Sequence, residues 1–314
     1  MALTFVAGSA HVRTPATSAN LGPGFDALGL ALSLHDELSA SVTDAGFRVE
    51  ISGEGAGELP TDAGHLVVRA MLATFDELGE RPPGLAVSCV NHIPQARGLG
   101  SSSAAIVGGV LLARGLVSGG EARLDDAGAL RVAAKLEGHP DNVAPCLLGG
   151  FTIAWTEGAG ARAVTIDTHP GVRPTVFVPA ERGYTASARR ALPPEVPHAD
   201  AAFNAGRSAL LVHALTNDPT LLLAATEDRL HQGYRAESMP GTASLVAGLR
   251  SVGVAAAVSG AGPSVLAFTE VPGDFRAGRE WRAVSLGVDG TGALAKGSMV
   301  RHAERSTVAA GRTS

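Results

Sequence analysis

The run Gly98-Leu-Gly-Ser-Ser-Ser103 has the residue types that chemistry on a phosphate group would need. It follows a predicted strand over residues 85–90 and precedes a predicted helix that runs to about Leu116. Gly98 and Gly100 can approach a ligand closely or adopt positive φ, and the serines lie where a helix has unpaired N–H groups. The run is therefore either an ordinary loop with a serine N-cap or a phosphate site at a helix N-terminus.

A second polar group follows a predicted helix over residues 125–137, which Gly138 ends. Glu137 opposes the helix dipole there, although exposed glutamates often do so without any function. The next residues, His139-Pro-Asp-Asn142, complete a cluster that suits a divalent cation or a polar substrate. One histidine without a nearby cysteine does not make a zinc pattern, so the oxygen ligands favour magnesium.

A glycine turn lies near the N-terminus, because Gly22-Pro-Gly24 cannot continue a helix or a strand. Asn20 and Asp26 flank it. Such side chains commonly stabilise turns by bonding to their own backbone. The functional alternative is that both face a pocket beside the serine-rich run, since loops on a rigid strand frame often carry binding groups.

Two common nucleotide-binding motifs do not fit the serine-rich run. A Walker A motif needs lysine after its last glycine, and Gly100 is followed by serine. A dinucleotide fingerprint needs a third glycine where Ser103 stands, and Glu121, about 20 residues further on, lies in a predicted turn.

Composition excludes several classes of protein. The 314 residues are 45% hydrophobic and 18% charged, which is enough for a buried core in two domains or one large one. A net charge of −5 without a basic block predicts no nucleic-acid partner and no membrane surface. Cys89 and Cys146 cannot form a disulfide framework. With no long apolar run and a poor signal peptide, we expect a cytoplasmic protein.

The apolar pattern predicts an α+β protein. A small, flexible stretch over residues 156–162 places a boundary there, giving halves 1–158 and 159–314. The predicted strands are 28–34, 47–51, 147–155, 163–167, 175–178, 254–258 and 265–268, and the further predicted helices are 65–78, 200–215, 219–231 and 242–251.

Four segments together resemble the GHMP small-molecule kinases, most closely their homoserine kinase branch. Residues 94–104 are similar to the nucleotide-binding loop of the family, and Ser259-Gly-Ala-Gly-Pro-Ser264 is similar to its C-terminal glycine motif. Two further segments are similar to strings of the homoserine kinase branch: Pro15-Ala-Thr-Ser-Ala-Asn-Leu-Gly-Pro-Gly-Phe-Asp-Ala-Leu-Gly29 and Glu137-Gly-His-Pro-Asp-Asn142. The resemblance spans about residues 10–270.

The resemblance implies a two-domain GHMP kinase fold. The N-terminal half would be like the second domain of ribosomal protein S5, and the C-terminal half would be ferredoxin-like. It also implies ATP-dependent phosphorylation of the L-homoserine hydroxyl, a step of threonine biosynthesis, with Mg²⁺. Members of this branch are often homodimers.

The resemblance further implies roles for individual residues. Glu137 would hold magnesium together with Ser102, and Asp141 would be either a catalytic base or a ligand of the substrate ammonium. The residues around the ATP phosphates would be Pro94, Gln95, Ala96, Arg97, Gly98, Leu99, Gly100, Ser101, Ser102, Ser103 and Ala104. The residues around homoserine would be Asn20, Asp26, His139, Asp141, Arg189 and Arg235.

The sequence departs from the family pattern in three places. Gly233 stands where proline is usual, Tyr184-Thr185 replaces a Ser-Thr pair, and His65 stands where asparagine is common near the adenine. Two alternatives remain: a GHMP kinase acting on mevalonate, a sugar or a shikimate-type alcohol, and a GHMP-fold protein that binds without catalysis. A binding protein should lack the magnesium carboxylate, so Glu137 favours an enzyme.

Overall fold

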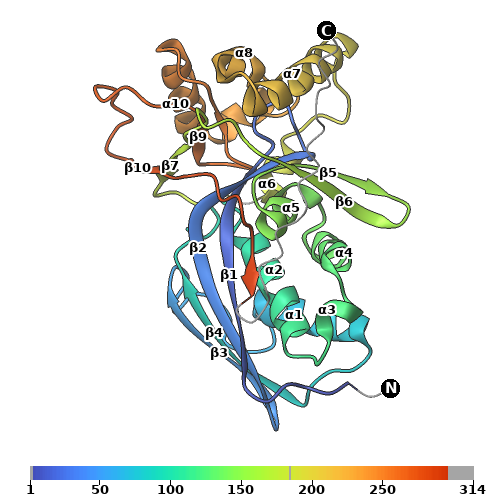
Figure 1. Cartoon of the computed structure of the whole chain (residues 1–314). Coiled ribbons are helices and arrows are strands. Elements are labelled where there is room, and N and C mark those ends of the chain that lie inside the picture. The colour runs from blue at the N-terminus through green and yellow to red at the C-terminus, as the bar shows by residue number, and fades with distance from the viewer. Residues whose placement is uncertain (1–2, 184, 296–314) are drawn as a thin grey trace.

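Two β-sheets, one in each half of the chain, form the framework of the molecule (Figure 1). The computed structural model describes residues 3–183 and 185–295. Within these residues the first sheet has seven strands and the second has four. None of the helices in the same residues is long and apolar enough to cross a membrane.

The larger sheet is built around the long strand β2 (Leu28–Thr43). Leucine at every second position predicted a strand over residues 28–34, and the structure confirms and extends it. β2 pairs with β1 along most of its length, with β5 at its start and with β4 at its end. The other strands of this sheet are β1 (Ser9–Ala19), β3 (Gly46–Gly53), β4 (Gly84–Asn91), β5 (Phe151–Glu157), β6 (Gly160–Ile166) and β11 (Leu294–Ala295).

Helix α2 (Ser101–Gly115) lies at the centre of this half and packs on β1. Its side chains are apolar on nearly every side and most are buried, as expected for a helix inside a core. α1 (Leu66–Leu78) packs along it, and α4 (Asp126–Glu137) ends at Gly138 in the left-handed conformation, as predicted. The remaining helices of this half are α3 (Gly120–Arg123) and α5 (Pro140–Leu148).

The predicted strand over residues 147–155 is wrong in its first part, because α5 extends to Leu148 and β5 starts only at Phe151. α5 begins with proline at its first position, where the missing N–H costs nothing. Pro145 lies inside the helix, and internal prolines usually break helices. The two prolines therefore argued against a helix in the sequence analysis, although one forms here.

The smaller sheet is antiparallel and has a core of its own. α10 (Pro240–Ser251) packs against it through Leu245 and Leu249, which contact Phe177 and Val265 in one cluster. Its strands are β7 (Thr175–Pro179), β8 (Ala256–Val258), β9 (Val265–Ala267) and β10 (Trp281–Ser285). The other helices are α6 (Thr185–Arg190), α7 (His198–Thr216), α8 (Leu222–Ala225) and α9 (Gln232–Arg235).

The predicted helix over residues 219–231 is broken in the structure. α8 ends at Ala225, and the chain crosses an irregular stretch before α9 begins at Gln232. The Asp228 carboxylate accepts hydrogen bonds from the backbone N–H groups of residues 230, 231 and 232. A side chain that caps a new helix start competes with continuation of the old helix, which propensity alone does not reveal.

The boundary predicted after residue 158 falls inside the hairpin of β5 and β6, which belongs to the larger sheet. We therefore propose a division between Ile166, the end of β6, and Thr175, the start of β7. The end of the described chain also returns to the larger sheet, because β11 pairs with β1 (Figure 1). Residues 296–314 and Tyr184, which the predictions included, lie outside the described residues.

Candidate active site

Backbone turns from both halves of the chain meet at one place. They are the N-terminal turn (residues 20–26), the serine loop (residues 94–104) and the C-terminal glycine loop (residues 259–264). The Ser259 hydroxyl donates to the Gly98 carbonyl at 2.7 Å, and Asn20 Nδ2 donates to the Gly260 carbonyl at 2.8 Å. The three turns are thus joined directly by hydrogen bonds.

Glycine in the serine loop is required by the protein's own packing. Gly98 and Gly100 have φ values of 72° and 70°, which side chains other than glycine rarely adopt. A Cβ on Gly98 would lie 2.3 Å from the Ser259 carbonyl oxygen, and one on Gly100 would lie 1.9 Å from Thr17 Oγ1. Both glycines thus have the positive φ that the sequence suggested. Their close approach is to parts of the protein itself, namely β1 and the C-terminal glycine loop.

Helix α2 begins with its N-terminus open. Its N-cap residue is Gly100, and no side chain among the described residues bonds to its first N–H groups, so the alternative of a serine N-cap is wrong. Ser102 and Ser103 instead donate to Glu137 Oε1 at 2.7 and 3.0 Å. Glu137 opposes the dipole of its own helix α4, but it lies beside the positive end of α2.

A cavity of about 80 Å³ opens beside this helix start. All six residues predicted to surround homoserine line it, together with Glu137 and Ser102. The two arginines come from the second half of the chain and the other groups come from the first half. Of the predicted phosphate residues, Ala96, Gly98, Gly100, Ser101 and Ser102 line the cavity. The side chains of Pro94, Leu99, Ser103 and Ala104 are instead buried in the fold.

The Asp26 carboxylate and the Arg189 guanidinium, which both line the cavity, form a two-point ion pair with N–O distances of 2.6 and 3.0 Å. Asn20 Oδ1 accepts a hydrogen bond from the Asp26 N–H, so Asn20 holds the N-terminal turn that carries the carboxylate. The hydrogen bonds that Arg189 donates to Asp26 outweigh its partial burial and raise the pKa of Arg189. Asn20 and Asp26 thus have a structural and an electrostatic function in the same turn.

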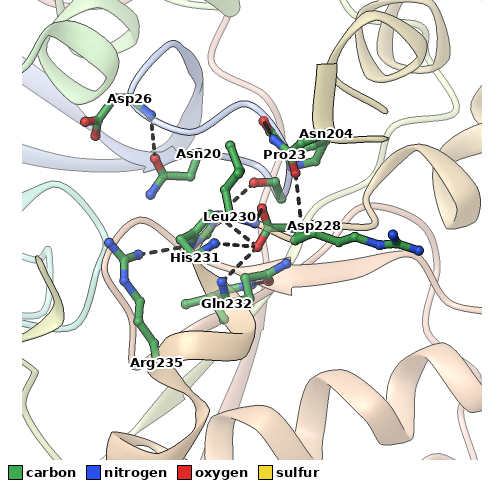
Figure 2. Close-up of polar contacts among 12 residues, drawn as sticks. Asn20, Pro23, Asp26, Asn204, Asp228, Leu230, His231, Gln232 and Arg235 are labelled. Atoms are coloured by element: carbon green, nitrogen blue, oxygen red, sulfur yellow. Dashed lines mark hydrogen bonds and ion pairs between the residues drawn. The ribbon is translucent and has the colours of Figure 1, made fainter. Parts of the chain in front are cut away.

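Arg235 is a cation with only 2% of its surface exposed, and Figure 2 shows its guanidinium pointing toward His231. It donates from Nε to the Ala188 carbonyl, and from Nη1 to His231 Nδ1 and the Gly260 carbonyl. It makes no ion pair in the part of the chain that is described, and Nη2 has no hydrogen-bond partner there. Burial, followed by the charge of Arg189, lowers the pKa of Arg235, so an anion in the cavity would relieve both effects.

The His139 ring donates from Nδ1 to Asp141 Oδ1 at 2.7 Å, and the Asp141 side chain is almost completely buried. Burial opposes the charged form of His139, but the hydrogen bond to Asp141 and the charges of Asp141 and Glu137 outweigh it. The pKa of His139 is therefore raised. This pair places an imidazole donor and a carboxylate at the start of α5, where both line the cavity.

Two features of the site were missed by sequence reasoning. Thr17 Oγ1 donates to Asn142 Oδ1 at 2.8 Å, which fixes the amide of Asn142 at the cavity wall. Asn142 and Thr17 both belong to motifs that the sequence singled out, but no role was predicted for either residue. The second feature is a cavity of about 340 Å³ at the start of α2, with apolar walls that include Leu38, Leu59 and Val67.

Asp36 holds the entry to the serine loop and was also missed. Its Oδ1 accepts the backbone N–H groups of His92 and Ile93, at 2.7 and 2.9 Å, where β4 has ended. The residue is 3% exposed. Burial raises the pKa of Asp36 to about 6, because it outweighs the two N–H bonds that favour the charged form. One buried carboxylate thus takes over the backbone pairing that the sheet no longer supplies.

The donor set around Glu137 can be compared with what Mg²⁺ requires. No group of three or more His, Cys, Asp and Glu side chains among the described residues could hold a metal ion. Mg²⁺ usually binds through one or two carboxylates plus substrate phosphates and keeps several waters. One carboxylate, Glu137, with the Ser102 hydroxyl at the open end of α2 fits that mode of binding.

Comparison with known families identifies the class of protein. Residues 65–150 match the family described as GHMP kinases N terminal domain, and residues 209–284 match GHMP kinases C terminal. The two stretches make up just over half of the chain, which therefore belongs to the GHMP kinases. The predicted family and fold class are confirmed.

Individual relatives narrow the assignment. The chain is 54% identical over 293 residues to the homoserine kinase of Streptomyces coelicolor, covering 92% of this chain and 95% of that protein. Identity to the homoserine kinase of Streptomyces avermitilis is 53%, with 92% and 96% covered. The crystal structure of homoserine kinase from Cytophaga hutchinsonii matches with a TM-score of 0.80 at 27% identity, covering 94% and 99%. Within the GHMP kinases, the chain groups with the homoserine kinases, as predicted.

Replacing Asp36 by Asn should change how stability depends on pH. Because its pKa is raised to about 6, the folded protein keeps a proton between about pH 4 and 6 that the unfolded chain releases. The stability from this group is present below that range and is lost as the pH rises through 6. We expect the wild type to exceed Asp36→Asn in free energy of unfolding by roughly 1 kcal/mol more at pH 5 than at pH 7.5. Urea denaturation measures this, and a difference that is constant or smaller at pH 5 would contradict it.

Proposed function

We propose that this protein transfers the γ-phosphoryl group of ATP to the side-chain hydroxyl of L-homoserine, giving O-phospho-L-homoserine and ADP. One observation carries the proposal. A single cavity brings the open N-terminus of α2 together with the buried cation Arg235 and the carboxylate Asp26. The first suits a phosphate and the other two suit the opposite charges of an amino acid. The names of the relatives point to the same substrate.

The donor nucleotide is proposed to lie along the serine loop. Its phosphates would meet the first N–H groups of α2, where the helix dipole favours negative charge. The apolar cavity of about 340 Å³ shares Ser101 and Ser102 with the cavity of about 80 Å³, so the larger cavity can take the base while the phosphates reach the smaller one. Arg97 would act indirectly, because its guanidinium donates to the carbonyls of residues 95, 179 and 180.

The acceptor amino acid is proposed to lie between the two arginines and the acidic groups. Among the described residues Arg235 has no counterion and no partner for its Nη2 donors, which makes it our first choice for the substrate carboxylate. Arg189 is the second choice, because Asp26 already occupies its guanidinium. Asp26 would bind the substrate ammonium. The Asp26–Arg189 pair already places a negative and a positive group side by side, which is the arrangement that suits the two opposite charges of an amino acid.

The chemistry requires positioning more than covalent help from the protein. Phosphoryl transfer passes through a loose transition state, so alignment of donor and acceptor and neutralisation of charge supply most of the acceleration. Asp141 faces the cavity and can accept an N–H or O–H of the acceptor, while His139 fixes its orientation. Glu137 and Ser102 would hold Mg²⁺, which when bound neutralises charge on the phosphates. Water exclusion would come from the buried walls that both halves provide.

Activity with a panel of alcohols tests the proposed function. We expect ADP release in the presence of ATP and Mg²⁺ with L-homoserine, and little with mevalonate, galactose or shikimate. Release with mevalonate but not with homoserine would contradict the substrate and favour another GHMP kinase. Absence of release with all four would favour a binding protein instead.

Replacing Glu137 by Gln tests the magnesium role. The amide keeps an acceptor for Ser102 and Ser103 but removes the charge beside the helix start. We expect kcat to fall by roughly 100-fold or more, because charge stabilisation at the transferring group is lost. Excess Mg²⁺ should restore only part of the activity.

The exposed Glu50 of β3 offers a matched control, since Glu50→Gln makes the same chemical change far from the cavity. It should retain the wild-type kcat. If Glu137→Gln also retained it, Glu137 would be an ordinary helix-end glutamate.

A further inference from the structure

His231 is fully buried and contacts two parts of the site, yet nothing in the proposed chemistry uses it (Figure 2). Its Nε2 lies 2.8 Å from the Gly22 carbonyl oxygen, and its Nδ1 lies 3.1 Å from Arg235 Nη1. Its ring also stacks on Phe25, with ring centroids 5.2 Å apart. Gly22 and Phe25 belong to the N-terminal turn that carries Asp26.

These contacts fix the protonation state of the ring. A carbonyl oxygen can only accept, so Nε2 of His231 carries the hydrogen that is donated to Gly22. The Arg235 guanidinium can only donate, so Nδ1 must be the unprotonated acceptor. A ring with one donor and one acceptor is neutral. Burial lowers the pKa of His231 and outweighs the nearby Asp228, which agrees with the neutral form.

We propose that His231 is the positioning residue that orients Arg235 toward the substrate carboxylate, by acting as a neutral hydrogen-bond acceptor. It takes one hydrogen of Nη1, while the Ala188 and Gly260 carbonyls take two other guanidinium hydrogens. The planar fork is then held with both hydrogens of Nη2 left for the ligand. The inference rests on the proposed function, because it presumes an acceptor that carries a carboxylate.

The surroundings of His231 explain why a histidine is suited to this position. Asp228 accepts the backbone N–H of His231 and so holds the start of α9, which carries both His231 and Arg235. Gly22 packs so closely that a Cβ would lie 2.6 Å from the Thr226 carbonyl oxygen. The ring thus joins the N-terminal turn to the arginine, and the relative position of Asp26 and Arg235 depends on it.

Two substitutions separate the two hydrogen bonds of the ring. The amide of His231→Asn lies where Nδ1 was and can accept from Arg235, but it does not reach Gly22. The amide of His231→Gln lies where Nε2 was and can donate to Gly22, but it leaves Arg235 without its acceptor. If His231 mainly holds the N-terminal turn, His231→Gln should be the milder change. If His231 mainly orients Arg235, His231→Asn should be the milder change.

We expect His231→Gln to lower kcat/KM for homoserine by about 10-fold or more, mainly through KM, because a hydrogen bond to a charged group is lost. His231→Asn should retain most of it. KM for ATP should be unchanged in both. With 3-aminopropan-1-ol, which has the hydroxyl and ammonium but no carboxylate, the two variants should have the same kcat/KM. Equal losses for homoserine, or a larger loss in the Asn variant, would overturn the inference.

Nitrogen NMR on the wild-type protein with labelled histidine gives a test that needs no variant. His231 should show protonated Nε2 and unprotonated Nδ1 between pH 6 and 8, and the Nδ1 signal should shift when homoserine is added. The opposite tautomer, or an unchanged signal with homoserine bound, would contradict the role. Failure of the proposed function is distinguishable, because the wild type would then release no ADP with homoserine.

Discussion

Close packing between glycine-containing turns is the constraint on which the rest of the structure depends. The serine loop and the C-terminal glycine loop touch where Gly98 meets Ser259, and a Cβ on Gly98 would not fit there. The N-terminal turn joins them through Asn20. Because these contacts involve backbone groups of both halves, they bring the two sheets together at the point where α2 begins. The site exists only when both halves are in place.

Charge is distributed around this junction in a consistent way. The positive end of α2, Glu137, Asp26, Arg189 and Arg235 all line one cavity. Asp26 and Arg189 pair with each other, whereas the hydrogen-bond partners of Arg235 in residues 3–183 and 185–295 are all neutral. Burying a cation without a counterion is costly, so the fold keeps a position where an anionic group of a ligand would be stabilised.

The sequence predicted what depends on local patterns and motifs. Alternating leucines indicated β2, and the six predicted substrate residues line one cavity. It could not reveal Asp36, because its partners are backbone N–H groups more than 50 residues away. Helix α5 was not predicted because it contains prolines. The break before α9 was not predicted because it depends on capping by Asp228. Contacts between distant backbone groups leave no sign in composition or periodicity.

If Arg235 binds the carboxylate of an amino acid acceptor, Arg235→Met should impair that acceptor selectively. Methionine keeps much of the buried volume and removes the charge. We predict that kcat/KM falls about 10- to 150-fold for homoserine, as expected for loss of a hydrogen bond between charged groups, and changes little for 3-aminopropan-1-ol. An equal loss with both substrates would mean that Arg235 supports the fold or the nucleotide site. That result would contradict binding of the substrate carboxylate by Arg235.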